Sequence, residues 1–368
     1  RMKVMWCREK LLEGLALANS VIPTKSTKPV VENVCLVATD NTLELVGTDM
    51  EVSLRYCIDD VKVEDPGTAV IPARVAFDFV RDLSGETVTL EVKGSTCSIE
   101  SGADACELVT VDPDEFPVVS RFDGENTITM QGGNFARLVD QTAFAAAREP
   151  GRYAMHGVLV ELEQDTLRMI ATDGRRLALS ETPVDGSGCE GAGQSIVPTR
   201  GMHMFCRAIA DPLDQVQLQF GETKMGLKTK NAEVFARLID GEFPRYAAVI
   251  PTETTRRMEA DRELLVKKLR LVANVTGDEA RAVKLKMSKN RLEVFGRSAG
   301  RGEATAHMEV DFKGSDAEIA FNPDYVIDGL KNCTLDTLCL EFTEHTSPGK
   351  FQLGEGYVYV VMPITVEV

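Results

Sequence analysis

Residues 42–54, TLELVGTDMEVSL, recur twice more along this chain of 368 residues. The second copy is TLRMIATDGRRLAL at 166–179, and the third is RLEVFGRSAGRGEA at 291–304. Their first leucines, at positions 43, 167 and 292, are 124 and 125 residues apart. A repeat of this length is a whole domain, because solenoid units span only about 20–50 residues. The chain therefore triplicates one domain, which is typical of proteins that build a surface or an enclosure.

Other segments return at the same period. VIPARVAFDFVRDL at 70–83 reappears as IVPTRGMHMFCRAI at 196–209 and as AFNPDYVIDGLKNC at 320–333. DPDEFP, which ends at Pro117, returns as IDGEFP, which ends at Pro244. We expect polar linkers at 123–126 and 251–255, and therefore three domains: 1–124, 125–251 and 252–368.

Each third combines helical periodicity with alternating strands, which predicts an α+β fold with antiparallel sheets and about eight strands per domain. Apolar residues at helical spacing begin each third, and a second helix follows a Pro or Asn-Pro start signal. The predicted helices are 8–20, 73–83, 134–148, 199–210, 261–275 and 322–332.

The charge of the chain is strongly negative but unevenly distributed. The net charge is −16, of which residues 1–124 carry −10. The six predicted helices together carry +4, so the strands and loops hold −20. Two explanations of this distribution remain open. Either the helices lie on one face of the protein that binds an anion, or Lys and Arg are enriched there because they favour helices.

The cysteines and the hydropathy of the chain indicate the cellular compartment in which the protein is expected. The nine cysteines are an odd number without a C-x-x-C pair, which indicates reduced thiols in a cytoplasmic protein. No run of 18 apolar residues occurs, so we expect no membrane span. The N-terminal segment also lacks the apolar core of a signal peptide.

Motifs for catalysis, cofactors or metals are weak. Gly186-Ser-Gly-Cys-Glu-Gly191 matches G-x-G-x-x-G, but a strand follows it where a nucleotide site needs a helix, so we expect a hairpin loop. The four histidines have no partners at metal-ligand spacing, and we expect no metal and no cofactor. Asp173 is the sharpest catalytic candidate, yet no second acid, base or nucleophile converges with it in sequence. A tight turn explains Asp173-Gly174 equally well.

At this point the motifs ATDGRRLA, IDGEFPRY, FNPDYVIDGL and YVVMPI identify a resemblance. Together, and in this order along the whole chain, they resemble the bacterial DNA polymerase III beta subunit family, the replication sliding clamps. The resemblance implies three tandem clamp domains per chain, with helices lining the inside and antiparallel sheets outside. It implies an arc-shaped chain that forms a ring as a head-to-tail homodimer around double-stranded DNA.

Simple geometry supports a ring of six domains. A domain of about 123 residues has a radius of gyration near 14 Å and approximates a sphere of roughly 18 Å radius. Three such spheres in contact leave an opening of about 3 Å radius, whereas six leave about 18 Å, enough for a duplex. Three domains per chain then require two chains and a closed twofold arrangement.

The resemblance implies a non-catalytic processivity factor that binds DNA without reading bases. A weakly positive lining would guide the duplex, whereas strong phosphate contacts would stall sliding. The residues expected to face DNA are Lys25, Arg74, Arg81, Arg137, Arg148, Arg152, Tyr153, Arg200, Arg207, Lys267, Lys268 and Lys331.

Family members capture their partners through short linear peptides rich in Leu and Phe. The implied partners are the DNA polymerase III alpha subunit, the clamp loader, and other polymerases and repair proteins. The matching groove positions are Arg152, Met155, Thr172, Gly174, Arg175, Arg176, Leu177, Pro244, Val249, Asn322, Tyr325, Thr346, Val360, Val361, Met362, Pro363 and Ile364. Of these, Leu177, Val249, Val360 and Met362 are expected to form an apolar slot.

The chain departs from the family pattern at three groove positions. Ala248 and Thr365 stand where basic residues are usual, and Ala280 stands where a bulky aromatic residue sometimes occurs. At the subunit junction, Cys106 and Leu108 are expected to pack against the partner near Asn274 and Val275.

Two other functions remain open at this point. One is a phosphoester or nucleotide enzyme that uses Asp173 with Arg175 or Arg176. The other is a triplicated scaffold that binds proteins but not DNA, which the acidic composition favours.

Overall fold

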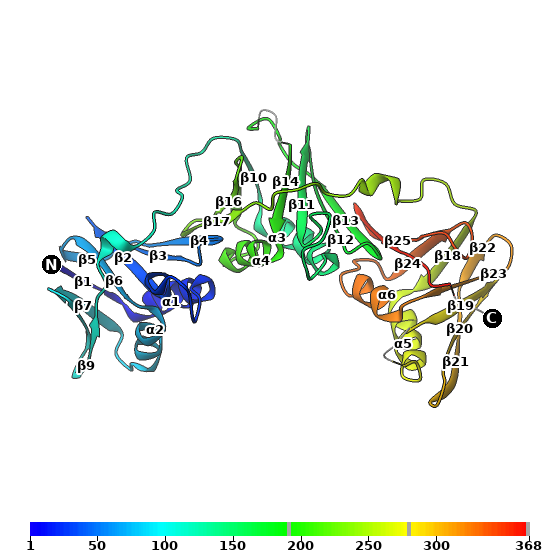
Figure 1. Ribbon diagram of the computed structural model, residues 1–368, viewed down its shortest axis with the longest axis horizontal. Helices are drawn as coiled ribbons and strands as arrows, with labels where there is room; N and C mark the ends of the chain where they lie inside the picture. The colour runs from blue at the N-terminus through cyan, green and yellow to red at the C-terminus, as the bar shows by residue number, and fades with distance from the viewer. Residues whose placement is uncertain (190–192, 278–280, 366–368) are drawn as a thin grey trace. The chain divides into compact units, whose positions relative to one another are not determined.

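A computed structural model describes residues 1–189, 193–277 and 281–365 (Figure 1). The chain forms two compact units. The first unit comprises residues 1–135, 185–192 and 200–238, and the second comprises 136–184, 193–199 and 239–368. Neither unit is a single repeat, because strands from consecutive repeats pair within one sheet.

An eight-stranded antiparallel sheet joins the first and second repeats in the first unit. Its central contact pairs a strand of one repeat with a strand of the next, and Leu54 lies opposite Val234 there. In order across the sheet the strands are β6 (Gly67–Pro72), β2 (Asn33–Thr39), β3 (Thr42–Thr48), β4 (Val52–Ile58), β17 (Ala232–Arg237), β16 (Lys224–Lys228), β15 (Gln215–Phe220) and β10 (Thr127–Gln131).

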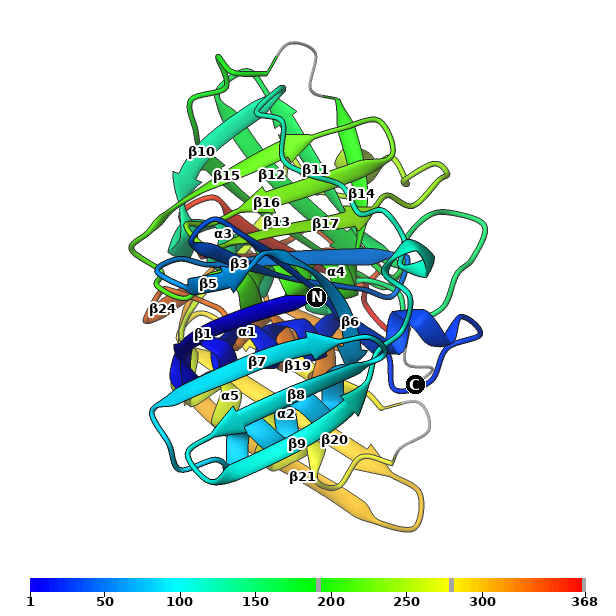
Figure 2. The ribbon, with the colours of Figure 1, turned by 90° about the vertical axis from the view of Figure 1, so that its left-hand side faces the viewer.

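A second sheet of the first unit contains five strands and ends at an edge strand (Figure 2). Its order is β5 (Lys62–Asp65), β1 (Met2–Cys7), β7 (Thr87–Lys93), β8 (Thr96–Ser101) and β9 (Asp104–Val109). The helices and short 3₁₀ turns of this unit are α1 (Arg8–Val21), η1 (Pro29–Glu32), α2 (Ala73–Asp82), η2 (Pro113–Glu115) and α4 (Thr199–Ala208). Helices α1 and α2 pack against each other.

The second unit repeats this plan with the second and third repeats. Its nine-stranded sheet has the order β14 (Gln194–Pro198), β11 (Gly157–Glu163), β12 (Thr166–Thr172), β13 (Arg176–Pro183), β26 (Tyr357–Val361), β25 (Gly349–Gly354), β24 (Thr337–Phe342), β18 (Arg256–Asp261) and β22 (Asp311–Lys313). A four-stranded sheet has the order β21 (Gly302–Glu309), β20 (Arg291–Ser298), β19 (Val283–Ser288) and β23 (Ala317–Phe321). The remaining helical elements are α3 (Gly132–Asp140), η3 (Ala143–Ala145), η4 (Tyr246–Ala248), α5 (Arg262–Ala273) and α6 (Pro323–Leu330).

Alternation of apolar and polar residues explains the strands. In β7 the side chains of Val88, Leu90 and Val92 are buried, and the residues between them are not. Side chains on a strand point to opposite faces in turn, so one face covers the core and the other meets solvent. Helix α1 buries Leu11 and Leu15 among others at a spacing of four, as an amphipathic helix requires.

The structure confirms five of the six predicted helices to within two residues at each end. The predicted helix 134–148 is wrong beyond its middle, because α3 ends at Asp140. Thr142 is not helical and its hydroxyl donates to the carbonyl of Leu138, while 143–145 form a separate 3₁₀ turn. Pro150 and Gly151 further along disfavour a continuous helix.

One turn appears in two repeats with the same hydrogen bonds. The Thr48 hydroxyl donates to the carbonyl of Val52, and the Thr172 hydroxyl donates to that of Arg176. The third turn residue has a positive φ in both copies, +79° at Met50 and +87° at Gly174. The repeat therefore preserves this strand connection even where a side chain replaces glycine.

No helix in the described part of the chain is long and apolar enough to cross a membrane.

Helix α6 packs so closely on β26 that a methyl group should not fit at Gly329. A Cβ there would lie 2.2 Å from a ring atom of Tyr359, whose side chain is fully buried. Gly329→Ala should therefore destabilise the protein by about 1–3 kcal/mol, despite the better helix propensity of alanine. Urea unfolding measures the change.

Gly151→Ala is the matched control, because a Cβ at that position meets no atom within 4 Å. Its free energy of unfolding should stay within about 0.5 kcal/mol of the unchanged chain. Equal stability of the two variants would mean that α6 and β26 are not in close contact.

Candidate functional site

The four residues of the expected apolar slot all lie in the second unit, but two of them are buried and two are exposed. Leu177 on β13 lies opposite Val360 on β26, and these side chains are only 2% and 1% exposed. Val249 and Met362 are 40% and 39% exposed. Leu177 and Val360 belong to a buried cluster, and residues on either side of Val249, Tyr246 and Ile250, pack against it. We call these four residues the apolar patch: a buried pair, with exposed Met362 two residues after Val360 and exposed Val249 next to Ile250, which packs on the same cluster.

Backbone hydrogen bonds hold the C-terminal part of this patch. The N–H of Met362 donates to the carbonyl of Arg175 at 2.9 Å, which extends the pairing of β13 and β26 by one step. The N–H of Ile364 donates to the carbonyl of Ala320 at 2.8 Å. Pro363 between them has no N–H to satisfy, so its place at the end of the ladder costs no hydrogen bond.

Arg176 holds the elements around the patch together. Its guanidinium donates to Asp173 at 3.1 Å, to Asp328 on α6 at 2.9 Å and to the carbonyl of Phe144 at 3.2 Å. The same group lies 4.7 Å from the ring centroid of Tyr325. The side chain is only 12% exposed, so these contacts take the place of water around its charge.

The charges of this network are stabilised by one another. Burial opposes ionisation of Asp328, but hydrogen bonds from Lys331 and Arg176 outweigh it and lower its pKa. Burial also opposes the charge of Arg176, yet the carboxylates of Asp328 and Asp173 outweigh it and raise its pKa. Burial raises the pKa of the Tyr359 phenol, which stays neutral and donates to the carbonyl of Tyr325.

Asp173 is a structural residue of the turn. One carboxylate oxygen accepts the N–H groups of Arg175 and Arg176 at 2.9 and 3.1 Å, and the other accepts from the Arg176 side chain. Both oxygens are therefore occupied in holding the turn. The corresponding Asp49 makes the same two backbone contacts in the first repeat, where Arg200 is its ion-pair partner at 2.8 Å.

All the expected groove residues lie in the second unit, at different exposures. Thr172 and Val361 are buried, like Leu177 and Val360. The half-buried residues are Met155, Arg176, Pro244, Asn322, Tyr325, Pro363 and Ile364. The exposed residues are Arg152, Gly174, Arg175, Val249, Thr346 and Met362. Ala248 and Thr365 are exposed, and Ala280 lies outside the described residues.

Sequence reasoning missed Asp328 and Phe144, which hold Arg176 in place. Asp328 is within the expected helix 322–332, but no local motif shows that it meets a residue 152 positions away. The Phe144 contact uses a main-chain carbonyl, which any residue type could supply. Only the pairing of β13 with β26 brings these three segments together.

The corresponding position in the first unit is closed by the chain itself. Phe235 on β17 occupies the place that Val360 has on β26, and the ring of Phe122 lies 6.3 Å from it. The N–H of Phe122 donates to Glu233 at 3.0 Å, and the Lys228 ammonium lies 5.5 Å from the Phe122 ring. The repeat position of Phe122 is Val249 in the second unit, so a large ring fills the first site where a smaller, exposed side chain borders the second.

Most of the expected DNA-facing cations are on helices. Arg74 and Arg81 are on α2, Arg137 is on α3, Arg200 and Arg207 are on α4, and Lys267 and Lys268 are on α5. The placement of Arg148 on a helix is wrong, because α3 ends eight residues earlier. Lys331 is the residue that follows α6. Lys25, Arg152 and Tyr153 are exposed and lie outside helices and strands, as expected.

Carboxylates already balance some of these charges. Arg81 pairs with Asp78 at 2.7 Å and with Asp82 at 2.9 Å. Lys331 pairs with Asp328 at 2.9 Å, and Arg200 pairs with Asp49. These pairs reduce the positive charge at α2, at α4 and at the end of α6.

Two of the residues expected at a subunit junction lie on an edge strand, and the other two follow a helix. Cys106 and Leu108 are on β9, the edge strand of the five-stranded sheet; Cys106 is half-buried and Leu108 is buried. Asn274 and Val275 directly follow α5, which packs on β20 and β21. Strand β21 is itself the edge of its sheet.

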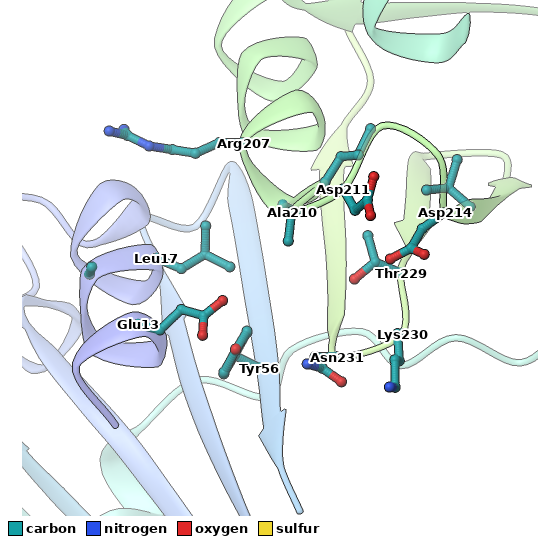
Figure 3. A pocket seen from close by; sticks show the side chains of 14 residues that line it. Glu13, Leu17, Tyr56, Arg207, Ala210, Asp211, Asp214, Thr229, Lys230 and Asn231 are labelled. Carbon is teal, nitrogen blue, oxygen red and sulfur yellow. The ribbon is translucent and has the colours of Figure 1, made fainter. Parts of the chain in front are cut away.

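A cavity of about 330 Å³ is present in the first unit (Figure 3). It lies between α1, the end of α4 and the β16–β17 turn, and Glu13, Tyr56 and Asn231 lie along it. Burial raises the pKa of the Tyr56 phenol to about 12, and neighbouring Glu13 adds to this shift. The phenol is neutral at physiological pH, and the cavity lining is mainly apolar.

Residues 186–189 of the glycine motif form a turn, and a strand, β14, follows them as expected. The prediction of a hairpin is wrong, because this loop joins β13 to β14, and β14 pairs with β11 instead. Gly191 of that motif lies outside the described residues. Within the described ranges, no three His, Cys, Asp or Glu side chains are grouped as metal ligands would be.

A thrice-repeated α+β domain, whose sheets continue from one repeat into the next, is the architecture of a clamp. Three family descriptions match in succession. Residues 2–120 match the N-terminal domain, 129–245 the central domain and 247–365 the C-terminal domain of the DNA polymerase III beta subunit. The chain belongs to the DNA polymerase III beta subunit family.

Relatives and solved structures agree over the full length. The beta sliding clamp of Pseudomonas putida is 30% identical over 362 residues, covering 97% of this chain and 98% of that one. The crystal structure of the Pseudomonas aeruginosa subunit has a TM-score of 0.95 at 27% identity, covering 99% and 100%. That of the C. crescentus clamp, with PEG bound to a putative beta-motif tethering region, has a TM-score of 0.92 at 29% identity, covering 99% of each chain.

The protein is thus a DNA sliding clamp and a non-catalytic subunit of a DNA polymerase complex. The alternative of an enzyme that uses Asp173 is excluded by the family, and the turn contacts of Asp173 give this residue another role. The family likewise excludes the alternative of a scaffold that binds proteins but not DNA.

Removal of the Arg176 guanidinium should loosen the turn, α6 and β26 together. Arg176→Ala leaves Asp328 without one partner and the Phe144 carbonyl without its donor. We expect a loss of about 2 kcal/mol or more in the free energy of unfolding at neutral pH, measured by urea titration. Arg175→Ala, at the exposed neighbouring position, should change it by less than about 0.5 kcal/mol.

The pH dependence gives a second readout. Because the folded state lowers the pKa of Asp328, its stabilising effect is present above the ordinary carboxyl pKa and is lost as the pH falls through the folded value. Arg176→Ala should therefore lose less stability than the unchanged chain on acidification. Identical acid profiles would contradict this network.

Proposed function

We propose that two copies of this chain close head to tail into a ring around duplex DNA. The proposal assigns three clamp domains to each chain, at 1–124, 125–251 and 252–368, with helices toward the opening and sheets outside. The matched family ranges support these limits, although the third range begins at 247. The observation that carries the ring is a pair of incomplete sheets: β9 ends one and β21 ends the other.

The proposed junction joins the β9 edge of one chain to the β21 edge of its partner. Cys106 and Leu108 would lie on one side, and Asn274 and Val275 would lie beside the partner's β21. Unpaired strand edges readily pair with another chain, which supports this choice. Two identical junctions close a twofold ring and leave neither edge free.

The ring holds DNA by topology and contacts phosphates only weakly. The support is the balance of charge: the chain is −16 overall, and the cations expected to face DNA are on or near helices. Some of these cations are already paired with carboxylates, which limits their grip. A loosely held duplex can slide, whereas many phosphate contacts would make movement slow and salt-sensitive.

The apolar patch of the second unit binds Leu- and Phe-rich peptides of the DNA polymerase III alpha subunit, the clamp loader, other polymerases and repair proteins. Exposed Val249 and Met362 would border the peptide side chains, with buried Leu177 and Val360 as the base. Gly174 is exposed and has no Cβ, so a peptide backbone can approach it. The closed counterpart at Phe122 supports one such site per chain.

A cytoplasmic location belongs to the same proposal. The support is that all nine cysteines lie within the described residues and no two of them form a disulfide, which suits a reducing compartment.

A topological tether should depend on the ends of the DNA. Protein loaded by a clamp loader onto a nicked circular plasmid should remain bound in moderate salt, because a closed protein ring cannot slide off DNA that has no ends. Linearisation with a restriction enzyme should then release most of it within minutes. Gel filtration of the DNA fraction measures retention, and equal retention on circles and linear DNA would indicate ordinary phosphate binding.

Met362→Ala should weaken binding of a Leu/Phe-containing peptide without unfolding the protein. The exposed side chain forms apolar contact area at the proposed site, and its removal should raise the dissociation constant about tenfold. Fluorescence anisotropy with a labelled peptide measures this. Met50→Ala is the matched control, because Met50 is 45% exposed on the related turn of the first unit. Unchanged affinity in Met362→Ala would move the site elsewhere.

A further inference from the structure

The four sheets in the described part of the chain are two complete copies and two halves of one design. In each large sheet, four strands of one repeat pair through a central contact with strands of the next, β4 with β17 and β13 with β26. We call the strands that the earlier repeat contributes to a large sheet its leading half, and those of the later repeat its trailing half. The four-stranded sheet that ends at β21 matches the leading half. The five-stranded sheet that ends at β9 matches the trailing half. The internal junctions therefore provide a template for pairing β21 with β9 of a second chain.

The leading half sets which residue of β21 meets the partner. Thr48, Thr172 and Arg297 occupy one position of the repeat, five residues after the aligned leucines. Their partners across the next hairpin are Ser53, Leu177 and Glu303, respectively. Glu303 is therefore the counterpart of Ser53 and Leu177, which lie at the internal junctions.

The trailing half sets the matching residue of β9. In each trailing half, the residue five positions before the first helix of the repeat has a partner on the next strand, which in turn has a partner on the strand after that. The three paths are Lys3–Glu91–Ser98–Glu107, Thr127–Gln219–Gly226–Phe235 and Arg257–Glu341–Lys350–Val360. Glu107 is therefore the counterpart of Phe235 and Val360. At the internal junctions these residues pair with Ser53 and Leu177.

We propose that Glu107 of one chain lies directly opposite Glu303 of the other at each junction of the ring. This inference rests on the proposed head-to-tail ring and adds its register and its electrostatics. Both glutamates are exposed in the single chain, as residues at an unfilled sheet edge should be. Cys106 then faces Ala304 of the second chain, on the side of the sheet that carries the helices.

The charge at this junction distinguishes it from the two internal ones. Ser53 faces Phe235, and Leu177 faces Val360, so neither internal pair carries a charge. Two carboxylates directly opposite each other on neighbouring strands repel. The cross-strand neighbour of Glu107 within its own chain is Ser98, and that of Glu303 is Arg297, so only the second carboxylate has a basic residue opposite it within its own chain.

A repulsive pair makes the subunit junction weaker than a junction built from the same strands with apolar partners. The covalently linked junctions have no reason to open, whereas a ring that encloses DNA must open at one of its junctions. The two glutamates thus act at the place where opening is required. Their effect is local, because the pairing of backbone groups along β9 and β21 is unchanged by them.

Charge reversal at both positions tests the register. We expect Glu107→Lys and Glu303→Lys each to lower the dimer dissociation constant about 4- to 30-fold, since each replaces two repulsive pairs per ring by attractive ones. The combination of both substitutions restores two like charges and should bind less tightly than either single variant. Fluorescence-detected sedimentation from nanomolar to micromolar concentration measures all four chains, and circular dichroism verifies that each is folded.

Glu309→Lys is the matched control, because Glu309 is exposed on the same strand but beyond the end of β9 in this register. It changes the net charge equally and should leave the dissociation constant within about twofold. It should also show no coupling with Glu107→Lys in the combined variant.

The outcomes separate the register from the ring. Strong coupling between positions 107 and 303, with the combined variant weaker than both singles, supports the proposal. Independent effects of the two substitutions in a chain that still dimerises would overturn the register and leave the ring intact. A chain that stays monomeric throughout the concentration range would overturn the ring itself.

Discussion

Antiparallel pairing between a strand of one repeat and a strand of the next is the interaction on which this structure depends. Without the contacts of β4 with β17 and β13 with β26, each large sheet would be divided into pieces of four or five strands with unpaired edges. These contacts also bring together segments that are far apart in the sequence. The Arg176 network exists because β13 and β26 are neighbours, so the binding surface is a consequence of the same strand pairing that joins the domains.

The two internal junctions use one design for different purposes. Both contain the Thr-Asp turn, with the same hydrogen bonds, and both place an apolar residue of the following repeat beside it. In the first unit, Phe122 covers Phe235 and closes the position. In the second unit, Val249 and Met362 leave apolar surface exposed. Side-chain differences at equivalent positions, Phe122 against Val249 and Arg237 against Met362 among them, thus separate a structural junction from the proposed binding site.

Charged residues have two different roles in this molecule, and their distribution is compatible with a protein that holds DNA loosely. The overall charge is acidic, and the expected DNA-facing cations include several that carboxylates already balance. The half-buried charges are instead found where elements must be held together, as at Arg176 and Asp328. Partly desolvated ion pairs connect elements of the fold, whereas exposed and partly balanced charges face the solvent and any ligand.

The sequence by itself determined the threefold repeat, the α+β class, most helices and the family, because these depend on local periodicity and on motifs that recur at a fixed spacing. It misplaced the end of α3, since the Thr142 hydroxyl and the following 3₁₀ turn stop the helix where apolar periodicity continues. Tertiary structure alone decided that Leu177 and Val360 are buried while Met362 is exposed, and that Asp328 meets Arg176. Those outcomes depend on which strands become neighbours, and strand pairing across a hundred residues or more leaves no local signal.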